Sequence, residues 1–310
     1  MTQFDPLADP LLAGIEMGGS KAVALVARGR RILRTRRVPT GAPRPTLEAL
    51  SAQLEAWSAE LGPFAGLGVA SFGPIGLDRA RADFGHITRT PKPGWSNVDL
   101  LGHFGARTAA PVGFDTDVAG AALAEALWGA GVGKSVVVYL TVGTGIGGGL
   151  VVDGRPVHGL VHPEMGHLRV RRASADPFAG VCPFHGDCLE GLASGPAVAA
   201  RAGAPAETLD DTHPVWPVVA GQLGELAASL ILTLSPQRIL IGGGVGMGRP
   251  VLLPMIRAAA LASLGGYVAG LTPASLSRII RRPALGERAG PLGAIALALA
   301  AVRNPTPSRA

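Results

Sequence analysis

Three glycine-rich stretches in this chain could bring backbone N–H groups against phosphate oxygens. They span residues 14–21, 143–149 and 242–248. Each follows an apolar run that predicts a buried strand, and the missing side chains let an anion approach the backbone closely. A tight turn would explain any one of them. Three such stretches, each at a strand end, favour a phosphate-binding site.

Two common nucleotide motifs do not fit these stretches. In the first, Lys21 follows Ser20 instead of preceding it and no helix comes next, so it is not a Walker A loop. The second contains Gly-x-Gly-x-x-Gly spacing, but residues 150–157 predict a hairpin where a dinucleotide fold needs a helix. The Rossmann interpretation is therefore rejected.

Asp117 follows a short predicted strand and begins an alanine-rich helix. Aspartate at this position is often a helix N-cap. It could also accept the proton of a substrate hydroxyl during phosphoryl transfer. Asp115, two residues earlier, is the less convincing candidate for that base.

A cysteine and histidine cluster offers metal ligands. Cys182, His185 and Cys188 form a Cys-x2-His-x2-Cys run, with His167 fifteen residues upstream of Cys182. Two sulfur and two nitrogen ligands suit tetrahedral structural zinc, whereas two buried thiols are the alternative. The histidines at 86, 158 and 162 are interpreted as ordinary loop residues.

Apolar periodicity predicts the elements that carry these groups. Strands are expected at 11–15, 21–27, 31–38, 66–70, 111–114, 135–142, 150–152 and 238–241. Helices are expected at 46–61, 117–128, 215–234 and 291–302. Residues 78–96 predict a surface or substrate-lining loop, because they are rich in turn formers. Two strand meanders, each followed by helices, predict a duplicated α/β fold with two lobes and a central cleft.

The predicted lobe boundary lies near Pro111. Residues 1–111 would form a small N-terminal lobe, which the helix at 291–303 joins, and residues 112–290 a large C-terminal lobe. The first lobe would carry the first glycine stretch, and the second lobe Asp117, the other two stretches and the metal cluster.

Composition limits the classes of protein that the chain can be. Of the 310 residues, 47% are hydrophobic and 16% charged, which excludes disorder as the main state. The net charge of +6 suits anionic small molecules and does not indicate nucleic acid. Two cysteines argue against a secreted disulfide framework, the apolar run at 292–302 is too short for a membrane span, and residues 1–10 lack signal-peptide features. We expect a cytoplasmic protein without membrane partners.

The motifs together resemble the ROK family of sugar kinases, specifically its bacterial fructokinase branch. The resemblance is carried by residues 14–21, 114–124, 141–149, 162–170, 182–196 and 242–245, in the family's order. It implies the actin-like, ribonuclease-H-like ATPase fold, ATP and Mg²⁺ as cofactors with structural Zn²⁺, and a homodimer.

The resemblance also implies roles for individual residues. Asp117 would be the catalytic base, and Glu16 would lie near the magnesium. The sugar hydroxyls would be bound by Glu164, His167 and Glu190. The phosphate and adenosine contacts would come from Gly18, Gly19, Ser20, Lys21, Gly143, Thr144, Gly145, Gly242, Gly243 and Gly244. The zinc ligands would be His167, Cys182, His185 and Cys188.

Three positions depart from the wider family pattern. Glu16 stands where many members have Asp, and His185 where glucokinase-like members have Cys, both as in the fructokinase branch. Ala119 replaces an Asn of the family's Asn-Asp-x-Asn stretch, so it removes one amide near Asp117.

The sequence therefore predicts ATP-dependent phosphorylation of a hexose, D-fructose to fructose 6-phosphate. A kinase for glucose, mannose or N-acetylmannosamine is the alternative, because discrimination rests on pocket shape. A non-catalytic sugar-sensing regulator is disfavoured, since only ten residues precede Leu11 and a DNA-binding helix-turn-helix has no room there.

Overall fold

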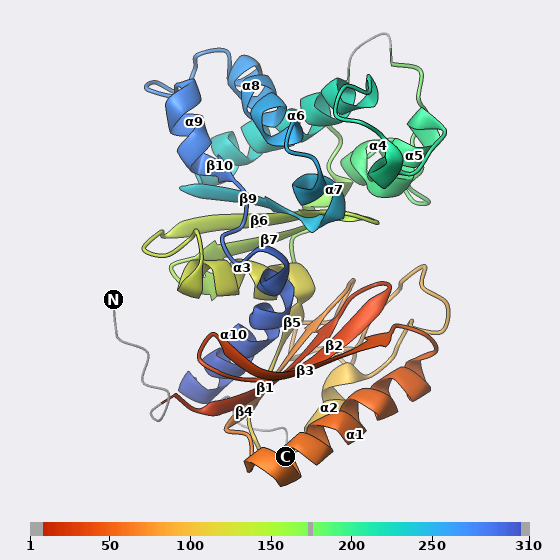
Figure 1. The fold of residues 1–310 in the computed structure, drawn as a ribbon, viewed down its shortest axis with the longest axis vertical. Coiled ribbons are helices and arrows are strands. Elements are labelled where there is room, and N and C mark those ends of the chain that lie inside the picture. Colours follow the sequence, from red (N-terminus) through yellow and green to blue (C-terminus); the bar gives the residue numbers. More distant parts are fainter. Residues whose placement is uncertain (1–8, 173–175, 305–310) are drawn as a thin grey trace. The chain divides into compact units, whose positions relative to one another are not determined.

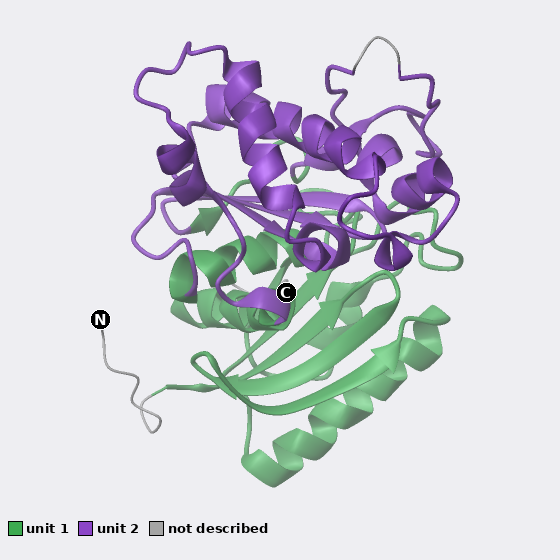
Figure 2. Cartoon of the chain, turned by 45° about the horizontal axis from the view of Figure 1, so that its top comes forward, with its two compact units in different colours: residues 1–128, 155–162, 288–310 green, residues 129–154, 163–287 purple. Residues whose placement is uncertain are grey.

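A computed structural model describes residues 9–172 and 176–304, and its chain forms two compact units (Figure 2). The first combines residues 1–128, 155–162 and 288–310, and the second residues 129–154 and 163–287. Residues 1–8, part of the stretch that lacks signal-peptide features, lie outside the described residues. Residues 112–128, which the sequence assigned to the second lobe, lie in the first unit, because their strand pairs with the first sheet and their helix packs on the C-terminal helix.

The first sheet contains five strands in the order β3-β2-β1-β4-β5 (Figure 1). They are β1 (Leu11–Met17), β2 (Lys21–Arg28), β3 (Arg31–Pro39), β4 (Gly66–Ser71) and β5 (Val112–Thr116). The first three form an antiparallel meander, whereas β4 pairs parallel with both β1 and β5. The carboxyl ends of β1, β4 and β5 therefore lie along the same edge, where chemistry-bearing loops gather in α/β sheets.

Helices cover both faces of this sheet. They are α1 (Pro43–Leu61), α2 (Leu100–Gly105), α3 (Asp117–Trp128) and α10 (Ala289–Arg303). Helix α1 packs over β2 and β3, and α10 runs across β1, β4 and β5 (Figure 1). Helix α10 can lie close to the sheet because two of the strand residues that face it are glycines. A Cβ at Gly68 would lie 1.8 Å from the carbonyl oxygen of Ala294, and one at Gly113 would lie 2.3 Å from that of Leu297.

The second sheet repeats the plan of the first, in the order β10-β9-β6-β7-β8. Its strands are β6 (Val136–Val142), β7 (Ile146–Val152), β8 (Arg155–Pro156), β9 (Arg238–Gly242) and β10 (Ile280–Arg281). Strands β6 and β7 form an antiparallel hairpin and β9 pairs parallel with β6, as β4 does with β1. This repetition agrees with the duplicated architecture that the sequence predicts.

The second unit is mainly helical outside its sheet. Its α-helices are α4 (Leu189–Ala193), α5 (Gly195–Ala202), α6 (Val215–Leu234), α7 (Gly243–Gly248), α8 (Leu252–Leu264) and α9 (Pro273–Ile279). The 3-10 turns η1 (Met165–His167) and η2 (Ala206–Thr208) belong to it, and η3 (Gly286–Arg288) leads into α10. Helix α6 is long and apolar enough to cross a membrane, but 67% of its apolar window is buried, as in the core helix of a folded protein.

Three local predictions need correction. Strand β7 begins at Ile146, so the second glycine stretch is a short turn over 143–145 and not a loop to 149. The third stretch forms helix α7 where a loop was expected. Residues 78–96 are not only a surface loop, because Ile87 and Trp95 are fully buried in the core of the first unit.

Candidate active site

The first glycine stretch is the tight turn between β1 and β2. Gly18 N donates to the carbonyl oxygen of Lys21 over 2.9 Å, and a Cβ at Gly18 would lie 2.8 Å from that oxygen. A Cβ at Gly19 would meet nothing within 4 Å. Ser20 and Lys21 are exposed. The turn therefore presents bare backbone, a hydroxyl and an ammonium group, which together can bind an anion.

Lys92 is a second cation at this turn, and the sequence analysis missed it. Its Nζ donates to the carbonyl oxygen of Gly19 over 2.6 Å. The neighbouring Trp95 fixes the segment, because it is fully buried and its Nε1 donates to Gly41 O. A signal was present in the composition: the chain has three lysines, at 21, 92 and 134, and two of them lie at this turn.

Asp117 lies at the junction of β5 and α3. Thr116, not Asp117, is the helix N-cap, because its Oγ1 accepts the Ala119 N–H over 3.1 Å. The Asp117 carboxylate accepts the Val118 N–H over 2.9 Å. The substitution at Ala119 removes an amide side chain, but its backbone still takes part in the cap. Asp117 is thus not required for capping and is left for another role.

Asp117 lies close enough to Glu16 to affect the ionisation of Glu16. Burial raises the pKa of Glu16 to about 7, and the charge of Asp117 adds to the rise, whereas Lys21 and Arg37 oppose it. Burial likewise raises the pKa of Asp117 to about 6, against the hydrogen bonds from backbone N–H groups. Perturbed carboxyl groups beside an anion-binding turn are typical of functional sites.

The second glycine stretch is hydrogen-bonded to residues of α4 and α5. Glu190 Oε2 accepts the Ile146 N–H over 2.9 Å, and a Cβ at Gly145 would lie 2.6 Å from the same oxygen. Gly195 N donates to the carbonyl oxygen of Gly143 over 2.7 Å. Glu190 therefore has a structural task in addition to the sugar contact that the resemblance implies.

The third glycine stretch lies against the second. Gly243 has φ of +83°, and a Cβ there would lie 2.4 Å from the carbonyl oxygen of Val142, so only glycine fits. A Cβ at Gly244 would meet nothing within 4 Å. A cavity of about 630 Å³ is lined by Gly143 and Thr144 of the second stretch and by Gly244 of the third, among others. That volume is within the usual range for small-molecule sites.

The predicted metal ligands converge in the second unit. One ligand atom from each of His167, Cys182, His185 and Cys188 lies within 4.8 Å of the others. His167 Nδ1 is 3.8 Å from Cys182 Sγ and 3.5 Å from Cys188 Sγ, and His185 Nδ1 is 3.7 Å from Cys182 Sγ. Tetrahedral zinc, with bonds of about 2.0–2.3 Å, separates its ligands by roughly this much.

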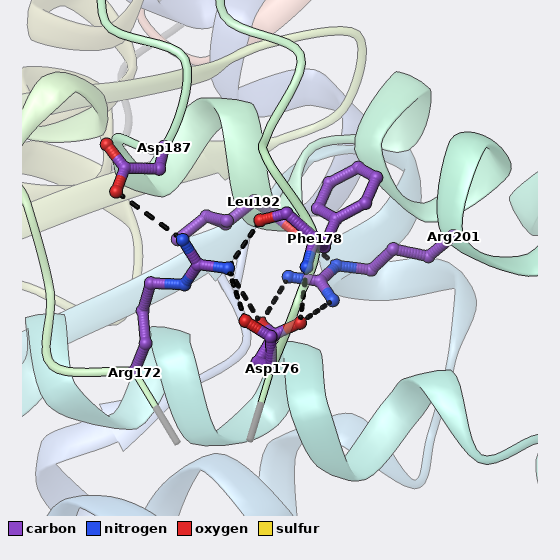
Figure 3. A network of polar contacts seen from close by, with 6 residues as sticks. All are labelled: Arg172, Asp176, Phe178, Asp187, Leu192 and Arg201. Carbon is purple, nitrogen blue, oxygen red and sulfur yellow. Dashed lines mark hydrogen bonds and ion pairs between the residues drawn. The ribbon is translucent and has the colours of Figure 1, made fainter. Parts of the chain in front are cut away.

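An ion-pair network next to this cluster joins the chain after His167 to helix α5 (Figure 3). Arg201 holds the Asp176 carboxylate with two hydrogen bonds of 2.9 and 2.8 Å, and its guanidinium lies 4.1 Å from the centre of the Phe178 ring. Arg172 donates to Asp176 O over 3.0 Å and to Asp187 over 3.4 Å. Arg172 follows His167 by five residues and Asp187 precedes Cys188, so the network links two stretches of chain that lie close in sequence to metal ligands.

The remaining sugar candidate, Glu164, is the N-cap residue that precedes the 3-10 turn η1, and its carbonyl oxygen accepts the His167 N–H over 3.0 Å. Glu164, His167 and Glu190 thus belong to the second unit, and Glu16 and Asp117 to the first.

Two sheets of the same plan, with glycine turns at their strand ends, define a protein of the actin-like ATPase class. The chain belongs to the ROK family, whose pattern matches residues 12–301. The family and the fold class that the sequence predicts are therefore confirmed.

Relatives and solved structures support this assignment. A fructokinase from Zymomonas mobilis subsp. mobilis is 43% identical over 295 residues, covering 93% of this chain and 96% of that protein. One from Pediococcus pentosaceus is 36% identical, covering 95% and 99%. The structure of a ROK hexokinase from Thermus thermophilus is similar with a TM-score of 0.76 and 30% identity, covering 95% of this chain and 99% of that one.

Proposed function

We propose that this protein phosphorylates D-fructose with ATP to give fructose 6-phosphate. The observation that carries the proposal is Asp117, a carboxyl group of raised pKa beside Glu16 and the first glycine turn. The fructokinase names of relatives 36–43% identical over most of the chain support the choice of sugar. A ROK glucokinase from Streptomyces griseus, solved with glucose and AMPPNP, is 26% identical and more distant.

In the proposed reaction, Asp117 accepts the proton of the sugar hydroxyl as its oxygen attacks the γ-phosphorus of ATP. The bond from that phosphorus to the β,γ-bridging oxygen breaks, and ADP leaves. The turns at Gly19–Ser20 and Thr144–Gly145 would donate backbone N–H groups to phosphate oxygens, and the cations Lys21 and Lys92 lie beside the first of them. These N–H and ammonium groups are oriented before the reaction, so they can stabilise the negative charge on the phosphate oxygens without reorganising.

Glu16 is the residue that would hold Mg²⁺. The donor set fits a hard divalent cation, because two neighbouring carboxyl groups, Glu16 and Asp117, have raised pKa values that a positive charge between or beside them would lower. When bound, the ion would neutralise charge on the phosphate oxygens. Glu164, His167 and Glu190 are proposed to bind the sugar hydroxyls.

The Cys/His cluster is proposed to bind structural zinc through His167, Cys182, His185 and Cys188. We expect purified protein to contain one zinc per chain, and Cys188→Ser to lose it and to melt at a lower temperature, because a structural zinc stabilises the folded state directly. Elemental analysis and thermal unfolding measure the two effects. His213→Ala is the control, since that histidine is elsewhere in the second unit. Wild-type protein free of zinc after purification without chelators would refute this assignment.

A coupled ADP-release assay with fructose, mannose, glucose and N-acetylmannosamine tests the substrate. We expect the highest kcat/KM with fructose. A higher value with another hexose would replace the proposed substrate, and no ADP release with any of them would overturn the kinase proposal. We further propose a cytoplasmic homodimer, which the family resemblance supports and light scattering of the purified protein would test.

A further inference from the structure

Two histidines attach residues 155–162 to the ends of neighbouring strands in the first unit. His158 Nε2 lies 2.8 Å from Asp115 Oδ2, in β5. His162 Nε2 accepts the Ile75 N–H over 3.1 Å, four residues after β4 ends. The paired residues are 43 and 87 positions apart in the chain. The segment therefore contacts the same sheet edge from which Asp117 begins α3.

Asp115 is a buried carboxylate with both oxygens engaged. It is 2% exposed, and its Oδ1 accepts the Thr116 N–H over 2.7 Å while Oδ2 meets His158. A buried charge is costly unless it is paired and hydrogen-bonded. The hydrogen bond to Asp115 raises the pKa of His158, so the imidazole offers the partner that a buried carboxylate requires.

The pair acts on the stretch that carries Asp117. Asp115 holds the peptide N–H of Thr116, whose hydroxyl caps α3 at Ala119, and Asp117 is the next residue. A rotation of the 115–116 peptide would thus move both the cap and the Asp117 carboxylate. A displacement of about 1 Å at a reacting group can cost on the order of 100-fold in rate.

We propose that Asp115 and His158 form a positioning pair for Asp117, with His162 as the second anchor of the same segment. The proposal rests on the proposed function, in which Asp117 is the base. It replaces the interpretation of His158 and His162 as ordinary loop histidines.

The surroundings of His158 allow a sharp test. Its side chain is 35% exposed and lines a cavity of about 950 Å³, together with Phe114 and His86, all within the first unit. When His158 is replaced by alanine, free imidazole in solution can therefore reach Asp115.

We expect His158→Ala to lower kcat by about 10- to 100-fold while KM for ATP changes less than about twofold. His158→Gln should retain most of kcat, because its amide N–H can donate to Asp115, and added imidazole should partly restore His158→Ala. His103→Ala is the matched control: His103 is in the same unit and contacts Ser51 over 3.0 Å, and it should behave as wild type.

A double-mutant cycle completes the test. Asp115→Asn and His158→Ala should each lower kcat by about the same factor as the double variant, because both remove one pair. Multiplicative losses, or wild-type kcat in folded His158→Ala, would overturn the proposal. If His158→Ala does not fold, His158→Leu takes its place in the cycle with Asp115→Asn, and the same outcome would overturn the proposal. His158→Gln stays the conservative variant for comparison.

The cycle is measured with whichever hexose the wild type phosphorylates fastest. A preference for a sugar other than fructose would overturn the proposed substrate and leave this test intact. Unimpaired turnover in Asp117→Asn would separately overturn the proposed base.

Discussion

The fold stabilises the neutral form of Asp117, although the proposed reaction requires its carboxylate. Burial raises its pKa to about 6, and a base with a pKa near the working pH combines sufficient ionisation with sufficient basicity. Glu16, with its pKa raised to about 7, shares this environment. At the scale of single residues, these two carboxyl groups can therefore serve cation binding and proton transfer. Burying them in ionised form lowers the stability of the protein.

We expect kcat/KM, which reports ionisation in the free enzyme, to rise with pH through about 6, not through the range near 4 that is usual for aspartate, because only the ionised Asp117 accepts a proton. Asp117→Asn should lower kcat by about 10²–10⁴-fold with little change in sugar binding. Steady-state kinetics across pH and calorimetric titration with fructose measure both. A profile that stays flat down to pH 5 would contradict this assignment.

Ionisation of Asp117 through its raised pKa, which favours the reaction as the pH rises, lowers the stability of the protein over the same pH range. Between the ordinary value of 3.8 and the folded value of about 6, folded Asp117 binds more protons than the unfolded chain, so its contribution to stability falls as pH rises. Asp117→Asn should therefore raise the free energy of unfolding at pH 7 by about 1–3 kcal/mol, and by less as the pH falls toward 4. Urea unfolding at several pH values measures this, with exposed Glu48→Gln as the control. A destabilised Asp117→Asn at pH 7 would refute it.

At the scale of elements, the ion-pair network of Arg172, Asp176 and Arg201 stabilises the region around the metal ligands. Asp176 is 10% exposed, and the bidentate hydrogen bonds from Arg201 hold its pKa at about 2. Its depressed pKa means that this stabilisation is complete above about 4 and is lost as pH falls through about 2.

Asp176→Asn should lower the free energy of unfolding by about 2–4 kcal/mol at pH 7, because it leaves Arg201 buried without its anion. The difference from wild type should shrink in acid. Unfolding followed at pH 7 and pH 3 measures this, and Asp153→Asn, in the exposed turn between β7 and β8, is the control. An unchanged stability at pH 7 would show that the network contributes little.

At the scale of the whole chain, the first unit is assembled from three separate stretches, and its core is completed by the C-terminal helix α10. The closest approaches are between backbones, as at Gly68 and Ala294, where no side chain fits. The core of this unit therefore depends on contacts between residues as far apart in the chain as Gly68 and Ala294, and bringing such distant residues together costs loop-closure entropy.

Gly68→Ala should destabilise the protein by about 2–4 kcal/mol or prevent folding, since its Cβ would lie 1.8 Å from the carbonyl oxygen of Ala294. Gly105→Ala is the matched control in the same unit, because a Cβ there would meet nothing within 4 Å. Thermal unfolding compares the two. Equal stability of both variants would contradict the described packing of α10.

Long apolar elements were predictable because their signal is local. The helices at 117–128 and 215–234 have the predicted bounds, and the order of the glycine motifs led to the family. Prediction failed where glycine hides the period of an element, so that residues 146–149 of β7 and the whole of α7 were predicted as loops. It also failed at the boundary between the units, because residues 112–128 are assigned by pairing with a distant strand.

The sequence by itself determined the family and the fold class and supplied most of the candidate site residues, because these depend on residue type and short-range spacing. Only the tertiary structure decided which distant residues they contact and how their pKa values are shifted. Lys92 meets Gly19 across 73 residues, His158 meets Asp115 across 43, and Asp117 has a raised pKa through burial. Desolvation and long-range hydrogen bonds depend on which distant segments pack together, and no local pattern of residues contains that information.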